Sequence, residues 1–401
     1  MRINKTKTDC CGCTACESIC PHGAIRMVPD PFGFLYPQVD DSSCVDCGLC
    51  EKVCAFHAGY DTSLNLASPL SYAAKHKDPK EVAASQSGAA FVAFSDYILE
   101  QGGVVYGAGY EGYFRVVHKR AKTKKERDTF RGSKYVQSDM NAVFRQVRED
   151  LKMGLIVLFS GTPCQTAGLR SFIGKRWREH LFLMDIVCHG VSAPFVWRDY
   201  LGYLEEKEGM KITAVNFRDK RRFGWHSHVE SFLFDNGHTH TYNYTFYTHI
   251  LLRRSCYECP YADTRRPSDV TVADFWGIER TVAASMGADN KGCSLILVNT
   301  EKGKAWFDCA KEKMEYMPVP LADCLQPQLR HPSALHPKRL AFEDDYRRLG
   351  FEKTLRRYGF LGWRAEVRIC RKRIIRFVFG LFPKEVRQYV KKMIPLYRRI
   401  R

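Results

Sequence analysis

Two copies of one cysteine spacing, C-x2-C-x2-C-x3-C, open the chain and supply the residue type that binds iron. The first copy holds Cys10, Cys13, Cys16 and Cys20, and the second holds Cys44, Cys47, Cys50 and Cys54. Bacterial-type ferredoxins hold cubane iron–sulfur clusters with this spacing, and the fourth cysteine of each run ligates the other cluster. The spacing therefore predicts two [4Fe–4S] clusters with crossed ligand sets. One set is Cys10, Cys13, Cys16 and Cys54, and the other is Cys44, Cys47, Cys50 and Cys20.

A zinc site or a disulfide framework is the alternative interpretation of these cysteines. Zinc takes four ligands, usually from two CxxC pairs, and therefore fits two runs of four poorly. Pro21 completes the ferredoxin signature after the first run, whereas Ala55 breaks it after the second. Cys11 lies outside the spacing, and we expect its sulfur to lie beside the first cluster without ligating it.

A second group of cysteines lies on expected turns far from the first. Cys164 follows Gly-Thr-Pro, Cys188 precedes His-Gly, and Cys256 and Cys259 form a CxxC pair. Four thiols on loops from different parts of a domain would suit a third cubane. Two alternatives stay open: buried structural thiols, and a redox disulfide between Cys256 and Cys259.

These cysteines belong to longer blocks that resemble one known family. The blocks are residues 161–165, 188–190, 216–220 with 224–225, 256–259 and 269–277. In this order they are similar to the beta subunit of coenzyme F420-reducing hydrogenase and formate dehydrogenase, and the resemblance covers residues 70–335. It implies a flavoprotein that binds FAD beside a [4Fe–4S] cluster. It also implies the ligands of that cluster, which are Cys164, Cys188, Cys256 and Cys259.

The resemblance further implies where FAD would bind. The residues concerned lie in a Ser/Gly-rich turn and in the segment 131–135, and they are Ser85, Ser87, Gly88, Arg131, Ser133 and Lys134. Backbone amides at a helix start favour phosphate oxygens, and a basic side chain can neutralise a pyrophosphate. An ordinary helix cap with surface charges is the alternative. Ala89 and Ala273 stand where the family pattern has glycine, and each methyl narrows the approach of the backbone to a cofactor.

Three further residues are candidates for catalysis. His189, beside Cys188, is a candidate proton donor near a flavin, and a structural hydrogen bond is the alternative. Arg218 and Lys220 are candidates for contacting an anionic substrate or the flavin edge, and a surface ion pair is the alternative.

The elements that position these residues follow from periodicity and turn signals. Strands are expected at 24–28, 33–37, 104–108, 155–159 and 181–187, helices at 91–99 and 140–152, and a polar linker at 59–71. Asn236-Gly237 predicts a hairpin between 228–234 and 238–244. Strands that alternate with helices indicate an α/β core with its sites after the strand ends. We therefore expect an α+β chain: a ferredoxin-like two-cluster domain at 1–58, an α/β flavin-binding domain at 70–335 and a basic helical tail at 336–401.

Four histidines near the hairpin, His226, His228, His238 and His240, are candidates for a metal site. Alternating exposed positions of an antiparallel pair explain them as well.

Charge and composition limit the remaining possibilities. Of the net charge of +18, residues 338–401 carry +14, which leaves +4 for the rest of the chain. We expect this basic tail to form an amphipathic helix that lies on an anionic membrane surface or packs on protein. No nucleic-acid-binding module accompanies the charge. Seventeen cysteines without an apolar leader or a long apolar stretch favour the cytoplasm, with peripheral contact at the inner face of the membrane as an option for the tail.

The residues together predict an iron–sulfur flavoprotein oxidoreductase. Electrons would pass between ferredoxin-type clusters and FAD, which would reduce or oxidise a small organic substrate or a deazaflavin. The expected partner is a redox protein, either a ferredoxin or a dehydrogenase subunit. The alternative is an electron-carrier or adaptor subunit without its own substrate, for which a link to surface-polysaccharide synthesis is one option.

Overall fold

The computed structural model describes residues 3–58, 60–242, 248–363, 365 and 367. The chain divides into two compact units, Met1–Arg339 and Leu340–Arg401. The cysteine-rich module and the α/β body both belong to the first unit.

The cysteine-rich module is built around a two-stranded antiparallel sheet. Its elements are α1 (Ala15–Ile19), β1 (Ile25–Pro29), β2 (Leu35–Val39), α2 (Leu49–Lys52) and α3 (Ala55–Ala58). The strands pair from Ile25 opposite Val39 to Pro29 opposite Leu35, which confirms the two expected strands. The module's own core consists of a few apolar side chains packed among cysteines, so it is too small to be stable by hydrophobic burial alone.

An eight-stranded sheet forms the body, in the order β13-β3-β12-β11-β7-β6-β4-β5. The strands are β3 (Asn65–His76), β4 (Val104–Glu111), β5 (Arg115–Ala121), β6 (Val157–Gly161), β7 (Leu181–Ile186), β11 (Val270–Asp274), β12 (Ser294–Thr300) and β13 (Met314–Pro318). The central strands β4, β6, β7 and β11 run parallel, and antiparallel strands flank them. The parallel centre matters because its carboxyl edge is where α/β proteins place ligands.

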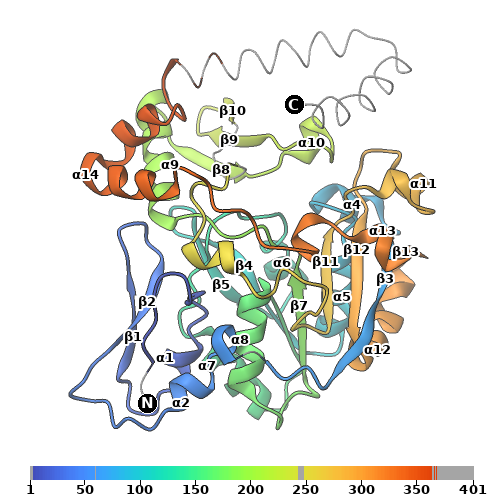
Figure 1. Cartoon of the computed structure of the whole chain (residues 1–401). Coiled ribbons are helices and arrows are strands. Elements are labelled where there is room, and N and C mark those ends of the chain that lie inside the picture. The colour runs from blue at the N-terminus through green and yellow to red at the C-terminus, as the bar shows by residue number, and fades with distance from the viewer. Residues whose placement is uncertain (1–2, 59, 243–247, 364, 366, 368–401) are drawn as a thin grey trace. The chain divides into compact units, whose positions relative to one another are not determined.

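Helices cover both faces of this sheet because alternate residues of a strand point to opposite faces. Val105 and Leu158 pack with α5 (Ala90–Glu100) and α12 (Glu301–Ala310). Tyr106 and Phe159 pack on the other face with α7 (Val143–Lys152) and α8 (Pro163–Ile173). Figure 1 shows α7 and α8 on the side of the sheet that faces the cysteine-rich module. Both expected helices are present, with ends shifted by up to three residues.

Shorter helices connect these elements. They are α4 (Pro79–Ala84), α6 (Lys124–Asp128), α11 (Ala284–Gly287) and α13 (Leu321–Cys324), with 3-10 turns η2 (Arg254–Glu258), η3 (Ile278–Arg280), η4 (Lys311–Lys313) and η5 (Pro327–Leu329).

A small three-stranded sheet, β10-β9-β8, holds the predicted hairpin. Its strands are β8 (Ile212–Asn216), β9 (Glu230–Phe234) and β10 (Thr239–Tyr242), and it is accompanied by α9 (Pro194–Glu208) and α10 (Lys220–Phe223). Trp197 of α9 packs against Phe217 and Phe232, which anchors the sheet on the helix. The hairpin turns at Asn236-Gly237 as expected, with Gly237 at a φ of 80°. Residues 243–244 of the expected second strand lie outside the described residues.

The module packs tightly on the α/β body. Its α1 contacts α7 and α8, and its α3 contacts α8. A Cβ atom added at Gly168 of α8 would lie 2.7 Å from the sulfur of Cys13, so the glycine permits this close approach. The hydroxyl of Tyr261 donates to the carbonyl of Ala55 at 2.7 Å, and Arg145 donates to the carbonyls of Glu17 and Ser18.

The expected linker at 59–71 is wrong in its second half. β3 begins at Asn65 and runs for 12 residues between β12 and β13. The polar residues of this segment made it look like a linker in the sequence. In the structure they have partners: the side-chain amide of Asn65 donates to the carbonyl of Arg266, and the hydroxyl of Ser71 donates to the carbonyl of Val319. Tertiary pairing therefore overrides the local polar pattern.

The second unit begins within α14 (Arg339–Arg357), which is broken at Gly350, where φ is 74°. Phe342 packs against Tyr346, Tyr358 and Phe360 in this unit. The apolar positions of the expected amphipathic tail helix, from residue 374 onward, lie outside the described residues. Within the part of the chain that the structure describes, none of the helices combines the length and apolar character that a bilayer span needs.

Candidate functional site

The structure brings together the two crossed cysteine sets of the module. The thiol of Cys16 interacts electrostatically with those of Cys13, Cys10 and Cys54. The other four, Cys20, Cys44, Cys47 and Cys50, line one small cavity. Burial raises the pKa of the Cys10 and Cys16 thiols, so thiolates at these positions need a compensating positive charge. Cluster iron would supply it, and the donor sets fit two cubanes. Cys47 is exposed, which makes its set the outer one.

Short local features place these sulfurs. Thr14 and Gly48 adopt left-handed backbone conformations, with φ of 68° and 73°, just before α1 and α2. Each helix therefore starts inside its cysteine loop and turns the third cysteine of its run toward the others. Glycine adopts this conformation freely, whereas Thr14 is held in it by the loop around it.

The second group of cysteines also converges. Cys164 lies in the first turn of α8, Cys188 follows β7, and Cys256 and Cys259 lie in and after η2. All four line one cavity beside the carboxyl ends of β6 and β7. Burial, with the neighbouring thiols, raises the pKa of Cys188 and of Cys259 to about 12. Four mutually facing thiols match the donor set of a cubane, as the resemblance implied. Every described cysteine is a free thiol.

Cys11 lies between the first set and this inner set. Its buried thiol makes side-chain hydrogen bonds with the sulfurs of both Cys13 and Cys164. This contact with Cys11 lowers the pKa of Cys164 to about 7. Cys11 is therefore beside the first set, as expected, and it also touches the inner set, a contact that nothing in the spacing indicated.

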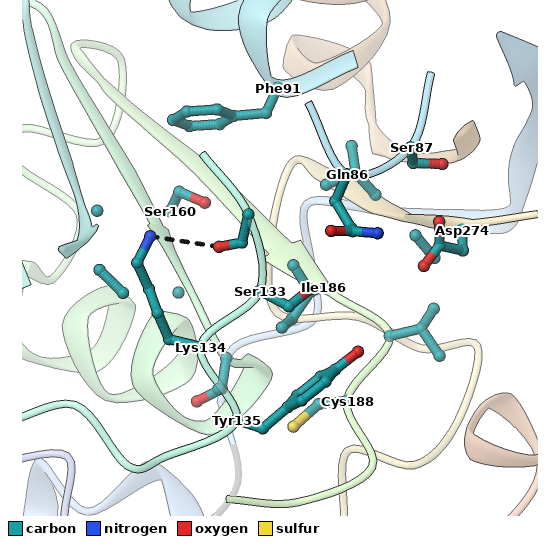
Figure 2. Close-up of a pocket in the computed structure, with 18 of the residues that line it drawn as sticks. Gln86, Ser87, Phe91, Ser133, Lys134, Tyr135, Ser160, Ile186, Cys188 and Asp274 are labelled. Carbon is teal, nitrogen blue, oxygen red and sulfur yellow. Dashed lines mark hydrogen bonds between the residues drawn. The ribbon is translucent and has the colours of Figure 1, made fainter. Parts of the chain in front are cut away.

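A cavity of about 540 Å³ opens at the carboxyl ends of three adjacent parallel strands, β6, β7 and β11. Its volume lies in the range of cofactor and ligand pockets. Figure 2 shows Phe91 of α5 and Tyr135, from the loop between α6 and α7, on different sides of the cavity. Cys188 lines this pocket and also the four-cysteine cavity, and so do Gly190 and Val191. The two cavities therefore share a wall.

Most of the residues predicted to contact a flavin line this pocket. They are Ser85, Ser87, Arg131, Ser133 and Lys134. Among the described residues, the Ser85 hydroxyl, the Gln86 amide nitrogen and the Nε of Arg131 are buried without a hydrogen-bond partner. Buried polar atoms normally have partners, so these three fit a polar ligand such as a diphosphate or a polyol chain. The pocket's size, position and donors thus fit FAD.

Gly88 differs from its neighbours because it does not line the pocket. A Cβ at this position would lie 2.3 Å from the carbonyl oxygen of Ala74 and 2.7 Å from the amide nitrogen of Ser294. Gly88 therefore allows the turn to pack on the sheet. Ala89, where the family pattern has glycine, lines the pocket in a left-handed conformation with φ of 66°. Ala273 lines the pocket too.

Two basic side chains occupy one wall of the pocket. Arg131 pairs with Glu81 and Asp128, both at 2.6 Å. The ammonium of Lys134 donates to the carbonyls of residues 129–132 at 3.0–3.3 Å and so closes the loop around itself. Burial lowers the pKa of Lys134 to about 7.

The three predicted catalytic residues separate in the structure. His189 lines the pocket, and burial, with His249 and His228 nearby, lowers its pKa to about 4, so its ring is neutral at pH 7. Arg218 also lines the pocket, with its guanidinium paired to Asp274 and 5.0 Å from the ring centroid of Trp276.

Lys220 does not line the pocket. Its ammonium donates to the carbonyls of Val82, Ser87 and Lys291 at 2.5, 3.2 and 2.8 Å. Burial lowers the pKa of this lysine to about 8. In the structure Lys220 holds the 82–87 turn against the 291 loop, and its contact with a substrate or flavin stays a prediction.

Several pocket residues were not among the predicted site residues, although Tyr135 and Trp276 lie in segments that the family resemblance includes. They include Gln86, Phe91, His118, Tyr135, Trp276 and Gln326. Gln86 lies between Ser85 and Ser87, and could have been predicted as a pocket residue from its position beside them. Phe91 comes from α5, His118 from β5 and the others from loops, and their convergence depends on strand order, which the sequence did not specify.

The four histidines near the hairpin divide into two pairs. His238 and His240 gather with Glu208, their ligand atoms within 4.8 Å of one another, and the Nδ1 of His240 is 3.4 Å from Glu208. His226 and His228 lie instead beside Trp276, with ring centroids 6.1 and 5.3 Å from its ring centroid.

Comparisons with known proteins match two segments of this chain and find one similar protein over most of its length. Residues 155–322 match the family model for the C terminus of the coenzyme F420 hydrogenase/dehydrogenase beta subunit, and residues 9–58 match a 4Fe-4S dicluster domain. One subunit of the F(420)H(2) dehydrogenase of Methanosarcina mazei is 23% identical over 333 residues, which are 78% of this chain and 85% of that protein.

Among solved structures, a chain of the xenon-derivatized F420-reducing [NiFe] hydrogenase complex from Methanosarcina barkeri aligns with a TM-score of 0.45 and 16% identity. The alignment covers 74% of this chain and 94% of that chain. The two matched segments are therefore similar to known domains: residues 9–58 to a 4Fe-4S dicluster domain, and residues 155–322 to the C terminus of the coenzyme F420 hydrogenase/dehydrogenase beta subunit.

Proposed function

We propose that this chain is an iron–sulfur flavoprotein component of a redox complex. It would exchange electrons between its cysteine-bound clusters and an FAD in the 540 Å³ pocket, and would reduce or oxidise a small organic substrate there. The observation that carries the proposal is the shared wall. Cys188 borders both the four-cysteine cavity and the pocket, so electrons would cross from one to the other through the residues that the two cavities share.

The residues of the pocket divide into binding and orienting roles. Ser85, Gln86 and Arg131 supply the buried donors that lack partners among the described residues, and these would hold the phosphate and ribityl groups. FAD, when bound, supplies the conversion between one-electron and two-electron transfer. Phe91, Tyr135 and Trp276 contribute apolar walls that exclude water from the reacting edge.

The cysteine sets would form a route of three steps. The outer set lies near the surface at Cys47, the first set lies between it and the body, and the inner set borders the pocket. Cys11 joins the first set to the inner set through its hydrogen bonds to Cys13 and Cys164. Electrons entering from a partner at the outer set would reach the pocket without leaving the protein.

The relative's name supports a deazaflavin as one substrate class, since a component of an F(420)H(2) dehydrogenase is similar over most of this chain. His189 and Arg218 both line the pocket and would contact the substrate or the flavin edge. The neutral ring of His189 would donate a hydrogen bond there. The same name supports a partner that is another polypeptide of a dehydrogenase complex.

The test is an anaerobic count of iron, acid-labile sulfide and released flavin per chain. About twelve irons and one FAD are expected for three cubanes and a flavin. Cys188→Ser should lose about four irons and perturb the flavin spectrum, whereas Cys47→Ser should perturb only the outer set. Cys309→Ser, an exposed cysteine of α12 outside all three sets, is the matched control and should keep the full inventory.

About eight irons without flavin would overturn the proposal. That result would instead favour an electron carrier without its own substrate.

A further inference from the structure

Arg253 is a buried cation at the junction of the first and inner cysteine sets. Its side chain is 0% exposed, and it directly precedes η2, which carries Cys256 of the inner set. Its Nε donates to the carbonyl of Cys10 at 2.7 Å, and its Nη2 lies 3.6 Å from the sulfur of the same residue. The remaining donors reach Gln137 Oε1 and the carbonyl of Leu35, both at 2.9 Å.

The first cysteine loop wraps around this guanidinium. A Cβ at Gly12 would lie 2.9 Å from the Nη1 of Arg253 and 3.0 Å from the Nε2 of Gln137, and Gly12 has a φ of 70°. Gln137 also donates to the carbonyl of Cys11 at 2.9 Å. The loop therefore turns its carbonyls toward the cation and leaves its thiols on the cluster side.

The charge of Arg253 has no carboxylate partner among the described residues, whereas three other fully buried arginines, Arg127, Arg218 and Arg266, each pair with a carboxylate. Burying an unpaired guanidinium is costly unless other negative groups compensate it. The negative groups that it faces are cysteine sulfurs, and its charge favours the thiolates of Cys10, Cys13 and Cys164. The aromatic faces of Tyr36 and Phe34, with centroids 4.2 and 5.5 Å from the guanidinium carbon, complete its surroundings.

We propose that Arg253 is a positioning residue that holds a fixed positive charge between the first cluster and the inner cluster, and thereby raises the reduction potential of the first cluster. A nearby positive charge and hydrogen bonds to the sulfurs stabilise the reduced, more negative form of a cluster. The step it serves is a one-electron transfer, in which one cluster is oxidised by one electron and its neighbour is reduced by one electron. The inner cluster belongs to the proposed function, but the effect on the first cluster does not depend on it.

The test is a redox titration of the full-length holoprotein, monitored by electron paramagnetic resonance, with dithionite as the reductant. Arg253→Gln should lower the midpoint potential of the first cluster so that the ratio of reduced to oxidised cluster falls at least tenfold at a given potential. That ratio corresponds to about 59 mV for a one-electron couple. The signal of the outer cluster, identified by its loss or change in Cys47→Ser, should not shift.

Three further variants separate charge from packing. Arg253→Lys keeps the charge and should keep the potential close to that of the parent protein. Gln137→Glu leaves Arg253 in place but puts a carboxylate 2.9 Å from it, and should lower the potential in the same direction. Arg127→Gln removes another fully buried arginine and should lower stability without shifting any potential. Its partners include Asp96, Asp128, Ser95 and Val92, and none of these is a cysteine.

The outcomes are decisive even where one variant fails to fold. An unshifted first-cluster potential in Arg253→Gln, with the iron content retained, would overturn the proposal. If that variant loses iron, an unshifted potential in Gln137→Glu would overturn it instead. If the parent protein shows no third cluster signal, the three-step electron route of the proposed function is wrong. The shift in the midpoint potential of the first cluster would still decide the role of Arg253.

Discussion

At the scale of single residues, the pocket wall with unpartnered donors is the part most directly open to test. The Nη2 of Arg131 forms ion pairs with Glu81 and Asp128, whereas its Nε lacks a partner among the described residues. We expect Arg131→Gln to lower the flavin content at least tenfold under limiting FAD, because a charge-assisted bond to phosphate contributes about 1.5–3 kcal/mol. The measurement is released flavin per chain after reconstitution with FAD.

The matched control for this change is Arg115→Gln in β5. Arg115 is also paired with two carboxylates, Glu111 and Asp139, but it is 55% exposed at its side chain and does not line the pocket. Equal flavin contents in the two variants would exclude a phosphate contact for Arg131.

Lys134 gives the pocket a predicted pH dependence. Burial lowers its pKa to about 7, so in the free protein the ammonium loses its proton as the pH rises through that value. An anionic ligand favours the charged form, so the affinity for FAD should be full below pH 7 and should weaken as the pH rises above it. Calorimetric titration of the flavin-free protein from pH 6 to pH 9 measures this slope.

Lys134→Met should bind FAD more weakly at low pH and should show no such slope. Lys119→Met, which changes an exposed lysine of β5, should retain the slope of the parent protein. A slope that persists in Lys134→Met would assign the titration to another group.

At the scale of elements, the backbone at the start of α5 is strained at Ala89, a residue that already departs from the family pattern in the sequence. Ala89 takes a left-handed conformation with φ of 66° where the family pattern has glycine. This conformation costs an L-residue about 1–2 kcal/mol, whereas glycine adopts it freely. Ala89→Gly should therefore raise the free energy of unfolding by about 1 kcal/mol, measured by the denaturant midpoint.

The same substitution inside the same helix should act in the opposite direction. Ala93 lies in the regular part of α5 and is 0% exposed, so Ala93→Gly should lower the free energy of unfolding by about 1 kcal/mol or more. If both substitutions destabilise the protein equally, the backbone at residue 89 is not strained.

Element types were predictable where periodicity was strong. The helix at 91–99, the strands after it and the Asn-Gly hairpin all appear, because hydrophobic alternation and turn chemistry are local signals. β3 was missed because its place between β12 and β13 is set by tertiary pairing. The surroundings of Lys220 were not predictable for a related reason: its ammonium donates to three backbone carbonyls that come from two separate segments of the chain.

The cysteine sets of the module were predictable from the sequence, but the junction between the first set and the inner set was not. Cysteine spacing specified the crossed sets of the module, since a short loop can present its sulfurs in few ways. The junction between the first and inner sets was not specified, because Cys11, Gln137 and Arg253 are separated by more than 100 residues along the chain. Only the docking of the module on α7 and α8 brings them together (Figure 1).

At the scale of the whole first unit, this docking brings the cysteine sets of the module and of the α/β body together, as the proposed electron route requires. Cys13 of the first set packs on α8, whose first turn carries Cys164 of the inner set. Gly168 permits the contact, since a Cβ there would lie 2.7 Å from the sulfur of Cys13. The distance between the two sets therefore depends on a single missing methyl group.

Two helical glycines separate this role from ordinary helix propensity. Gly202 of α9 has open space where a Cβ would be, so Gly202→Ala should raise the free energy of unfolding by about 0.5–1 kcal/mol. Gly168→Ala should not raise the free energy of unfolding in this way, because the added methyl pushes the first cysteine set away from α8. It should also slow reduction of bound flavin by dithionite in stopped-flow measurements, while the iron content is retained. If Gly168→Ala instead raises stability as Gly202→Ala does and leaves the rate unchanged, the close approach of Cys13 to α8 does not limit electron flow, and the route into the pocket does not pass through this contact.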